Sequence, residues 1–116
     1  MSRFQLLFHS LTYPAISMTT TAASKPPYGV YTPLVTFFHE DESIDFPAVE
    51  SHVRRMAEAG VAGLVLQGSN GEAPHLDHEE RQEVITRTRL TLDSLGYEDT
   101  KLIVGCGAPS VRETLI

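Results

Sequence analysis

The chain has 116 residues, of which 41% are hydrophobic and 21% are charged, a composition that fits one globular domain and excludes a disordered or fibrous chain. The formal net charge of −6, with nine Lys and Arg scattered along the sequence, provides no basic face for nucleic acid. No apolar run approaches the roughly 18 residues that a membrane span needs, and a single cysteine, Cys106, excludes an internal disulfide.

The first 28 residues differ in composition from the rest, because no Asp or Glu occurs before Glu40 while Ser and Thr are frequent. A Ser-rich, acid-poor start is typical of a mitochondrial presequence, although Arg3 is the only arginine in this stretch. The alternative is a disordered cytoplasmic extension, with Met18 as a second possible start. We therefore assign residues 1–28 to a leader or targeting segment, cytoplasmic with a mitochondrial alternative, and residues 29–116 to the folded domain.

Residues 29–36 are predicted to form a strand that Pro33 weakens locally, because proline lacks the N–H that a strand ladder needs. A helix is expected next, since Asp45 is placed to cap it, Pro47 is tolerated in its first turn and Gly60 follows its end. Its apolar residues recur at helical spacing and are Phe46, Val49, Val53, Met56 and Ala57.

Residues 62–67 are almost all apolar, without alternation, which is typical of a parallel strand covered on both faces. After a glycine-rich loop, Asp77 and Glu80 have the spacing of a capping box that begins a second helix, and Gly96 follows its end. The residues that this helix is expected to bury are Val84, Ile85, Thr88, Leu92 and Leu95.

A third apolar strand is predicted at residues 102–106, and residues 110–113 carry another capping-box signature, which begins a third helix. The alternation of strands and helices predicts an α/β fold with a parallel sheet. The third helix reaches Ile116 inside its second turn. Because a parallel sheet needs both faces covered, we expect an incomplete domain, either a fragment of a larger one or a chain whose partners lie elsewhere.

The loop after the second strand has the sequence Gly-Ser-Asn-Gly-Glu at residues 68–72. A glycine pair allows a sharp turn and leaves neighbouring N–H groups uncovered, so that a carboxylate or phosphate can approach them. The simpler interpretation is an ordinary strand-to-helix connection. A glycine loop of an RNA-binding module is excluded, because such a loop joins two helices in basic surroundings.

Three stretches carry a pattern seen together in one family. They are residues 29–38, residues 63–72 with Leu76 and the Glu-Glu-Arg of the next helix, and residues 104–108. From residue 29 to the end, the chain thereby resembles the dihydrodipicolinate synthase and N-acetylneuraminate lyase family. Its Ser-Asn version of the loop is most similar to 4-hydroxy-2-oxoglutarate aldolases and to fungal-type aldolases of 2-keto-3-deoxy sugar acids.

The resemblance implies a (β/α)8 TIM barrel, of which this chain supplies the amino-terminal three β/α units, and a homotetramer for the complete barrel. It also implies a lyase that works through a Schiff base between a lysine and a 2-oxo acid, without a metal or other cofactor. The implied reaction is reversible aldol cleavage of a 4-hydroxy-2-oxo acid or a 2-keto-3-deoxy sugar acid to pyruvate or glyoxylate plus an aldehyde.

On this resemblance, the backbone N–H groups of Ser69 and Asn70 hold the substrate carboxylate, and the Ser69 hydroxyl is also catalytic, in a proton relay with a tyrosine. The family's Schiff-base lysine and relay tyrosine belong to strands beyond Ile116. Lys25 precedes the first strand and Lys101 enters the third at its amino end, so neither is suitable. The second hypothesis is therefore a catalytically inactive truncated product, which at most binds a carboxylate or associates with full-length subunits.

Other polar residues near the loop are given structural roles. Glu72 is interpreted as loop-stabilising, because a carboxylate beside a carboxylate site would repel the substrate. His75 and His78 lack a cluster of partners and the helix start accounts for Asp77, so no metal site is assigned. Cys106 is expected to pack as a small hydrophobe near the barrel mouth.

Overall fold

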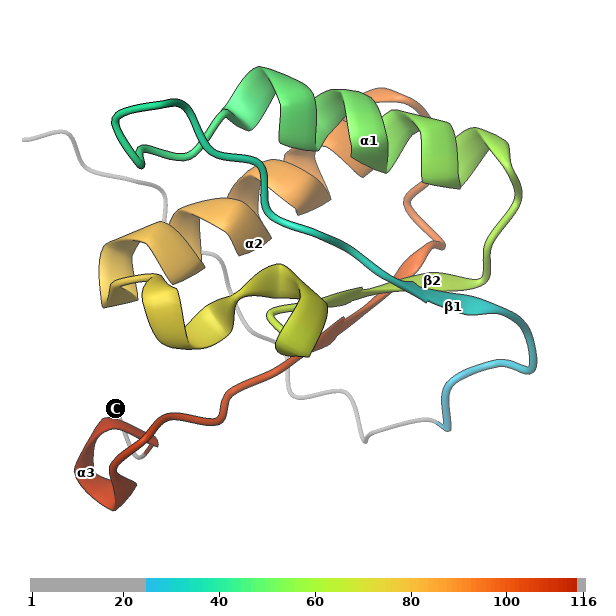
Figure 1. The fold of residues 1–116 in the computed structure, drawn as a ribbon. Coiled ribbons are helices and arrows are strands. Elements are labelled where there is room, and N and C mark those ends of the chain that lie inside the picture. The colour runs from blue at the N-terminus through green and yellow to red at the C-terminus, as the bar shows by residue number, and fades with distance from the viewer. Residues whose placement is uncertain (1–24, 115–116) are drawn as a thin grey trace, which may run out of the picture.

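The structure, a computed structural model, describes residues 25–114 (Figure 1). Its elements in chain order are β1 (Tyr31–Pro33), α1 (Phe46–Glu58), β2 (Gly63–Leu66), the 3-10 turns η1 (Ser69–Gly71) and η2 (Ala73–His75), α2 (His78–Ser94), β3 (Lys101–Val104) and α3 (Val111–Thr114). The predicted alternation of strands and helices is confirmed. The predicted leader, residues 1–28, lies outside the described residues except for residues 25–28.

The strands form a three-stranded parallel sheet in the order β1-β2-β3. Tyr31 pairs with Gly63, and Gly63 pairs with Lys101, so the three strands begin level with one another. β1 is shorter than the predicted strand at residues 29–36, and its last link is the Leu34 N–H, which donates to the Val65 carbonyl at 2.9 Å. In consequence, all three strands end at the same edge of the sheet.

The predicted helix ends are confirmed. The Asp45 carboxylate accepts a hydrogen bond from an N–H of the first turn of α1 at 3.0 Å. Asp77 and Glu80 make both bonds of the capping box of α2, at 2.8 and 2.9 Å. Gly60 and Gly96, just past the two helices, have φ of +76° and +81°, a left-handed conformation that favours glycine. No helix among the described residues is both long and apolar enough to cross a membrane.

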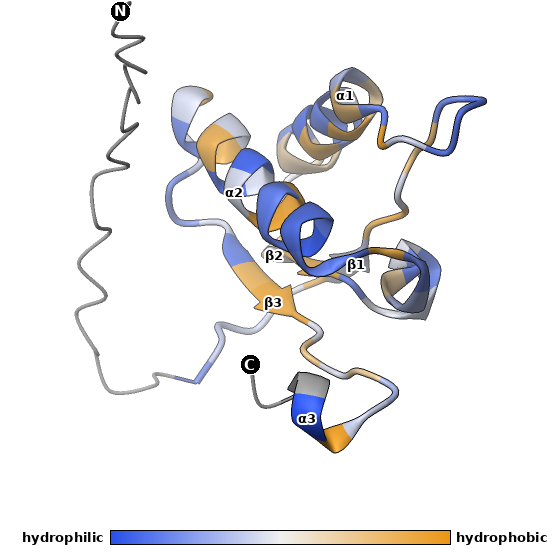
Figure 2. Cartoon of the chain, turned by 90° about the vertical axis from the view of Figure 1, so that its left-hand side faces the viewer, coloured by the Kyte–Doolittle hydropathy of each residue, from blue (hydrophilic) through white to orange (hydrophobic). Residues whose placement is uncertain are grey.

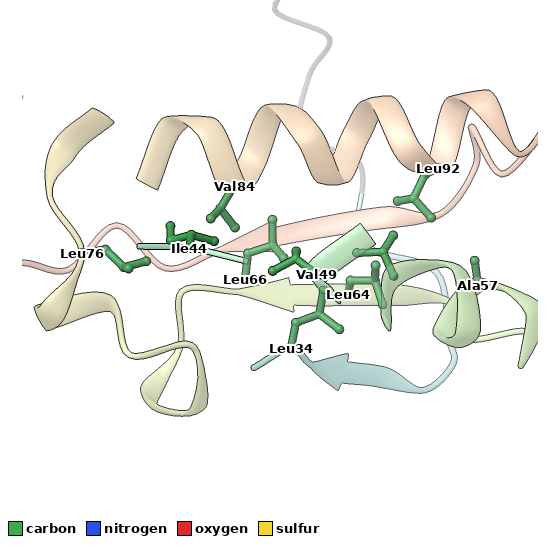
Figure 3. Close-up of a cluster of buried hydrophobic side chains, with 10 residues drawn as sticks. Leu34, Ile44, Val49, Ala57, Leu64, Leu66, Leu76, Val84 and Leu92 are labelled. Carbon is green, nitrogen blue, oxygen red and sulfur yellow. The ribbon is translucent and has the colours of Figure 1, made fainter. Parts of the chain in front are cut away.

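Both long helices lie on one face of the sheet, and Figures 1 and 2 show α1 and α2 side by side over the strands. Leu64 and Leu66 of β2 point into the core between these layers, as Figure 3 shows, and both are at most 1% exposed. Val53 from α1 and Leu92 from α2 are fully buried against them. Burying each of these side chains contributes about 1.5–3 kcal/mol to folding.

The opposite face of the sheet is partly open in the described part of the chain. Side chains alternate along β3, so Leu102 and Val104 pack on the core while Ile103, on the other face, is 41% exposed. Val65, which pairs with Ile103, is half-buried. The expectation that the second strand is covered on both faces is therefore corrected, because the two long helices, α1 and α2, pack on the same side.

Thr88 of α2 generates a prediction about stability. Its side chain is fully buried, and its hydroxyl has no hydrogen-bond partner in the described structure. An unpaired buried hydroxyl costs about 1–3 kcal/mol, and valine has a similar shape and helix propensity. Thr88→Val should therefore raise the free energy of unfolding of the 116-residue chain by about 1 kcal/mol, measured by urea unfolding followed by circular dichroism.

The control for this prediction is Thr88→Ser, which keeps the hydroxyl and removes a buried methyl group. It should lower the free energy of unfolding, because it leaves a small cavity without removing the unpaired oxygen. A Thr88→Val chain that is less stable than the wild type would show that the hydroxyl has a partner in solution.

Candidate functional site

The glycine-bracketed loop lies at the carboxyl edge of the sheet, directly after β2, where Figure 1 shows it in yellow-green and yellow. Its backbone forms η1 and η2 before α2 begins. The segment that follows β3 leaves the sheet at the same edge, since the strands are parallel and in register. In α/β proteins this edge is where ligands bind.

The left-handed residues of the loop are not its glycines. Gln67 and Glu72 have φ of +56° and +54°, whereas Gly68 has φ of −78° and space for a Cβ atom. The expectation that the glycine pair makes the turn is therefore corrected for Gly68. Gly71 has a different constraint, because a Cβ there would lie 3.4 Å from the Leu34 carbonyl oxygen of the neighbouring segment.

The backbone N–H groups of Ser69 and Asn70 donate no hydrogen bond to any residue in the range 25–114. The bonds of η1 begin one residue later, with the Gly71 N–H donating to Gly68 at 3.0 Å, because the first N–H groups of a helical turn have no acceptor within it. Ser69 and Asn70 are both exposed. Two adjacent donors that reach solvent are suited to hold the oxygens of an anion.

Two side chains fasten this loop to its surroundings. The Thr36 hydroxyl, after β1, donates to the Gly71 carbonyl at 2.8 Å. The Gln67 side chain, only 8% exposed, donates from Nε2 to the backbone carbonyl of Arg81 at 2.7 Å. These bonds hold the loop against β1 on one side and against α2 on the other. Neither role could be predicted from the sequence, since both contacts join segments far apart along the chain.

Arg81 joins the loop after β2 to the segment after β3. Its Nε and Nη2 donate to the Ala73 carbonyl at 3.2 and 2.8 Å, and Nη2 also donates to the Gly107 carbonyl at 3.3 Å. In the sequence this arginine belongs to the Glu-Glu-Arg pattern, from which no role for it was predicted. One feature of the sequence could have indicated a role for Arg81: it is a cation near the start of a helix, where the helix dipole favours an acidic residue.

The segment after β3 also approaches β2 closely at Gly105. A Cβ there would lie 2.3 Å from the Gln67 carbonyl oxygen, closer than any side chain can sit. The Gly105 N–H donates to the Leu66 carbonyl at 2.9 Å, so the contact is a hydrogen-bonded one. The segments that follow β2 and β3 are therefore in direct contact at the carboxyl edge.

A cleft beside the loop is lined by Phe38, His39, Glu42, Glu72, His75 and Glu80. In it the Glu72 carboxylate lies 3.6 Å from Nδ1 of His75, in agreement with the loop-stabilising role expected for Glu72. Asp77, the third member of the possible metal set, caps α2. Within residues 25–114, no three or more His, Cys, Asp and Glu side chains are grouped so that they could hold a metal ion.

Both lysines lie away from the loop, as expected. Lys101 pairs with Gly63, at the opposite end of β2 from the loop, and Lys25 precedes β1. Cys106 is exposed, which corrects the expectation that it packs as a small hydrophobe. The reason is that β3 ends at Val104, so the chain has already left the sheet at Cys106.

Comparisons with known proteins agree with this architecture. The sequence model of the Dihydrodipicolinate synthetase family matches residues 26–116. A "probable 4-hydroxy-2-oxoglutarate aldolase, mitochondrial" of Emericella nidulans is 55% identical over 87 residues, which are 75% of this chain and 28% of that protein. The L-threo-3-deoxy-hexylosonate aldolase of Hypocrea jecorina is 46% identical over 90 residues, which are 77% of this chain and 29% of that protein. The chain thus spans less than a third of the length of these relatives.

Solved structures share the fold of the described residues. The N-acetylneuraminate lyase of Proteus mirabilis matches with a TM-score of 0.70 and 27% identity, over 78% of this chain and 30% of that one. The dihydrodipicolinate synthase of Rhodopseudomonas palustris matches with a TM-score of 0.66 and 30% identity, over 77% of this chain and 28% of that one. The chain therefore belongs to the dihydrodipicolinate synthetase family, and its relatives there include aldolases.

Proposed function

We propose that this chain supplies the carboxylate-binding loop of a lyase that cleaves or forms a carbon-carbon bond in a 2-oxo acid. The observation that carries the proposal is the pair of N–H groups of Ser69 and Asn70, which reach solvent without an acceptor among residues 25–114. Two oriented donors fix the carboxylate and present the adjacent keto carbon to an amine. The substrate-binding residues of the proposal are therefore Ser69 and Asn70.

The names of two relatives, a 4-hydroxy-2-oxoglutarate aldolase and an L-threo-3-deoxy-hexylosonate aldolase, support the choice of substrate class. The proposed substrate is a 4-hydroxy-2-oxo acid or a 2-keto-3-deoxy sugar acid, cleaved reversibly to pyruvate or glyoxylate plus an aldehyde. A relative named as mitochondrial favours the mitochondrial alternative for the leader, residues 1–28, over the cytoplasmic one.

In this proposal, residues 29–116 form three β/α units of a (β/α)8 barrel, which assembles as a homotetramer when complete. Two observations support the barrel. Helices α1 and α2 lie on the same face of the sheet, whereas a doubly wound fold has helices on both faces. The open face carries Val65 and Ile103, and branched apolar side chains are what a barrel interior contains.

The proposed chemistry needs an amine that the described residues do not place at the loop. A lysine amine attacks the keto carbon of the 2-oxo acid, and water leaves as the protonated Schiff base forms. The Schiff base accepts the electron pair of the carbon-carbon bond as the aldehyde departs, so neither a metal nor a cofactor is required. The Ser69 hydroxyl carries protons in a relay with a tyrosine. The lysine and the tyrosine come from later strands of the barrel.

A second candidate function is carboxylate binding without aldol chemistry by the 116 residues themselves. The position of Lys101 favours it, because this lysine lies at the end of the sheet away from Ser69 and Asn70. The two candidates differ in whether a lysine from later strands completes the site.

Borohydride trapping tests whether either lysine of these 116 residues can take the Schiff-base role. The 116-residue chain incubated with pyruvate and borohydride should gain no mass, because neither Lys25 nor Lys101 lies at the carboxylate-binding loop. Intact-mass spectrometry followed by peptide mapping makes the measurement. A stoichiometric reduced-pyruvate adduct on either lysine would contradict this assignment.

A chimera tests the proposed catalytic role of Ser69. Residues 29–116 of this chain replace the matching segment of the Emericella nidulans relative, and cleavage of 4-hydroxy-2-oxoglutarate is measured with that parent protein as reference. The chimera should be active. Ser69→Ala in it should lower kcat by about a hundredfold with little change in KM, since the backbone donor remains and only the relay oxygen is lost.

Two further variants of the chimera make the assignment specific. Asn70→Pro removes an N–H donor, so it should raise KM for the 2-oxo acid. Ser94→Ala is the control, because this exposed serine at the far end of α2 donates only to the Thr91 carbonyl. Normal turnover in the Ser69→Ala chimera would refute the relay role and leave only the carboxylate-binding role of the loop.

A further inference from the structure

The guanidinium of Arg81 has uncommon partners for a cation in the first turns of a helix. Its hydrogen bonds go to the carbonyls of Ala73 and Gly107, and no salt bridge joins it to a carboxylate within residues 25–114. The position near the amino end of α2 is unfavourable for a cation, because the helix dipole is positive there. The stability of α2 alone therefore does not explain this residue.

Arg89, further along the same helix, provides the comparison. It donates to the carbonyls of Tyr97 and Thr100 at 3.0 and 2.8 Å, so it too fastens a connecting segment to α2. Its guanidinium, however, also lies 2.7 Å from the Asp93 carboxylate. Arg89 acts at the amino end of β3, whereas Arg81 acts at the carboxyl edge, beside the loop.

Arg81 contacts the loop through its hydrogen bonds to the Ala73 carbonyl. Ala73 is buried and follows Glu72, whose left-handed conformation is disfavoured for a residue with a side chain. The Glu72 N–H donates to the Ser69 carbonyl at 3.3 Å, so the position of Glu72 sets that of η1. A chain of contacts thus leads from the Arg81 guanidinium to the peptide that carries the Asn70 N–H.

We infer that Arg81 is a positioning residue, which holds residues 68–76 in the conformation that aims the Ser69 and Asn70 N–H groups at an anion and links this loop to the segment after β3. No carboxylate pairs with the guanidinium within residues 25–114, so its positive charge at the Ala73 and Gly107 carbonyls is not offset by an ion pair. The identity of the anion as a 2-oxo acid carboxylate rests on the proposed function. The link that Arg81 makes between the Ala73 and Gly107 carbonyls does not depend on the proposed function.

The first measurement is hydrogen exchange of backbone amides in the 116-residue chain. In Arg81→Met, the amides of Gly71 and His75, which donate within η1 and η2, should exchange about tenfold faster than in the wild type. Arg81→Lys keeps one charged donor and should recover part of the protection. Arg89→Met is the matched control on the same helix, and it should leave these two amides unchanged while loosening the segment before β3.

The second measurement is a pyruvate titration followed by the NMR resonances of the Ser69 and Asn70 amides. Arg81→Met should raise the Kd about tenfold, Arg81→Lys should raise it less, and Arg89→Met should leave it within about twofold of the wild type. A general loss of stability would affect the Arg81 and Arg89 variants alike, so the difference between them reports positioning.

The outcomes separate the inference from the proposed function. Equal changes in loop exchange in Arg81→Met and Arg89→Met, or none in Arg81→Met, would overturn the positioning role. An unaltered pyruvate Kd in Arg81→Met would also overturn it, while leaving the carboxylate site intact. If pyruvate shifts neither amide in the wild type but Arg81→Met still loosens the loop, the link that Arg81 makes is upheld and the carboxylate assignment is refuted.

Discussion

The burial of β2 beneath both long helices is the interaction on which the rest of the structure depends. Leu64 and Leu66 are at most 1% exposed, and they meet side chains from α1 and α2 together. Right-handed crossovers with both helices on the same face advance the strands in one direction, in agreement with the observed order β1-β2-β3. That order places the segments after β2 and β3 next to each other, and the candidate site consists of those segments.

The candidate site is held by contacts to backbone carbonyls more than by a packed set of side chains. Gly105 allows the segment after β3 to reach the Gln67 carbonyl, and the Thr36 hydroxyl holds Gly71 from the side of β1. Arg81 adds a third attachment at Ala73. A loop fixed at several carbonyls keeps its free N–H groups in one direction, and such preorganised donors bind an anion without reorganising at the moment of reaction.

The local features of this fold could be predicted from the sequence because they depend on neighbouring residues. Caps such as Asp45, the capping box at Asp77 and the glycine after each helix follow from short-range hydrogen bonding. The loop after β2 could be located for the same reason. Exposed apolar surface on an incomplete sheet could be expected, but which face stays open could not, since an apolar run such as residues 62–67 is the same whichever side the helices cover.

The contacts that hold the candidate site were missed for a related reason. Thr36 and Gly71, or Arg81 and Gly107, meet only once the sheet has brought their segments together. The left-handed conformation of Gln67 and Glu72 could not be predicted either. Glycine is the residue that usually indicates such a conformation, and here the glycines are the neighbouring residues. The family resemblance predicted roles for Ser69 and Asn70, but it did not predict which contacts hold the peptide groups of these residues in place.

The proposed anion site belongs to an acidic chain, so the charges closest to the loop matter most. The formal net charge is −6, and Glu42, Glu72 and Glu80 line the cleft beside the loop. At physiological ionic strength, charges separated by more than about 8 Å are largely screened, so the donors nearest the ligand decide its affinity. Glu72 lies 3.6 Å from the His75 ring, whereas the hydrogen bonds of Arg81 go to carbonyls and no carboxylate pairs with it within residues 25–114. The local balance at the loop can therefore favour a carboxylate even though the charge of the whole chain opposes it.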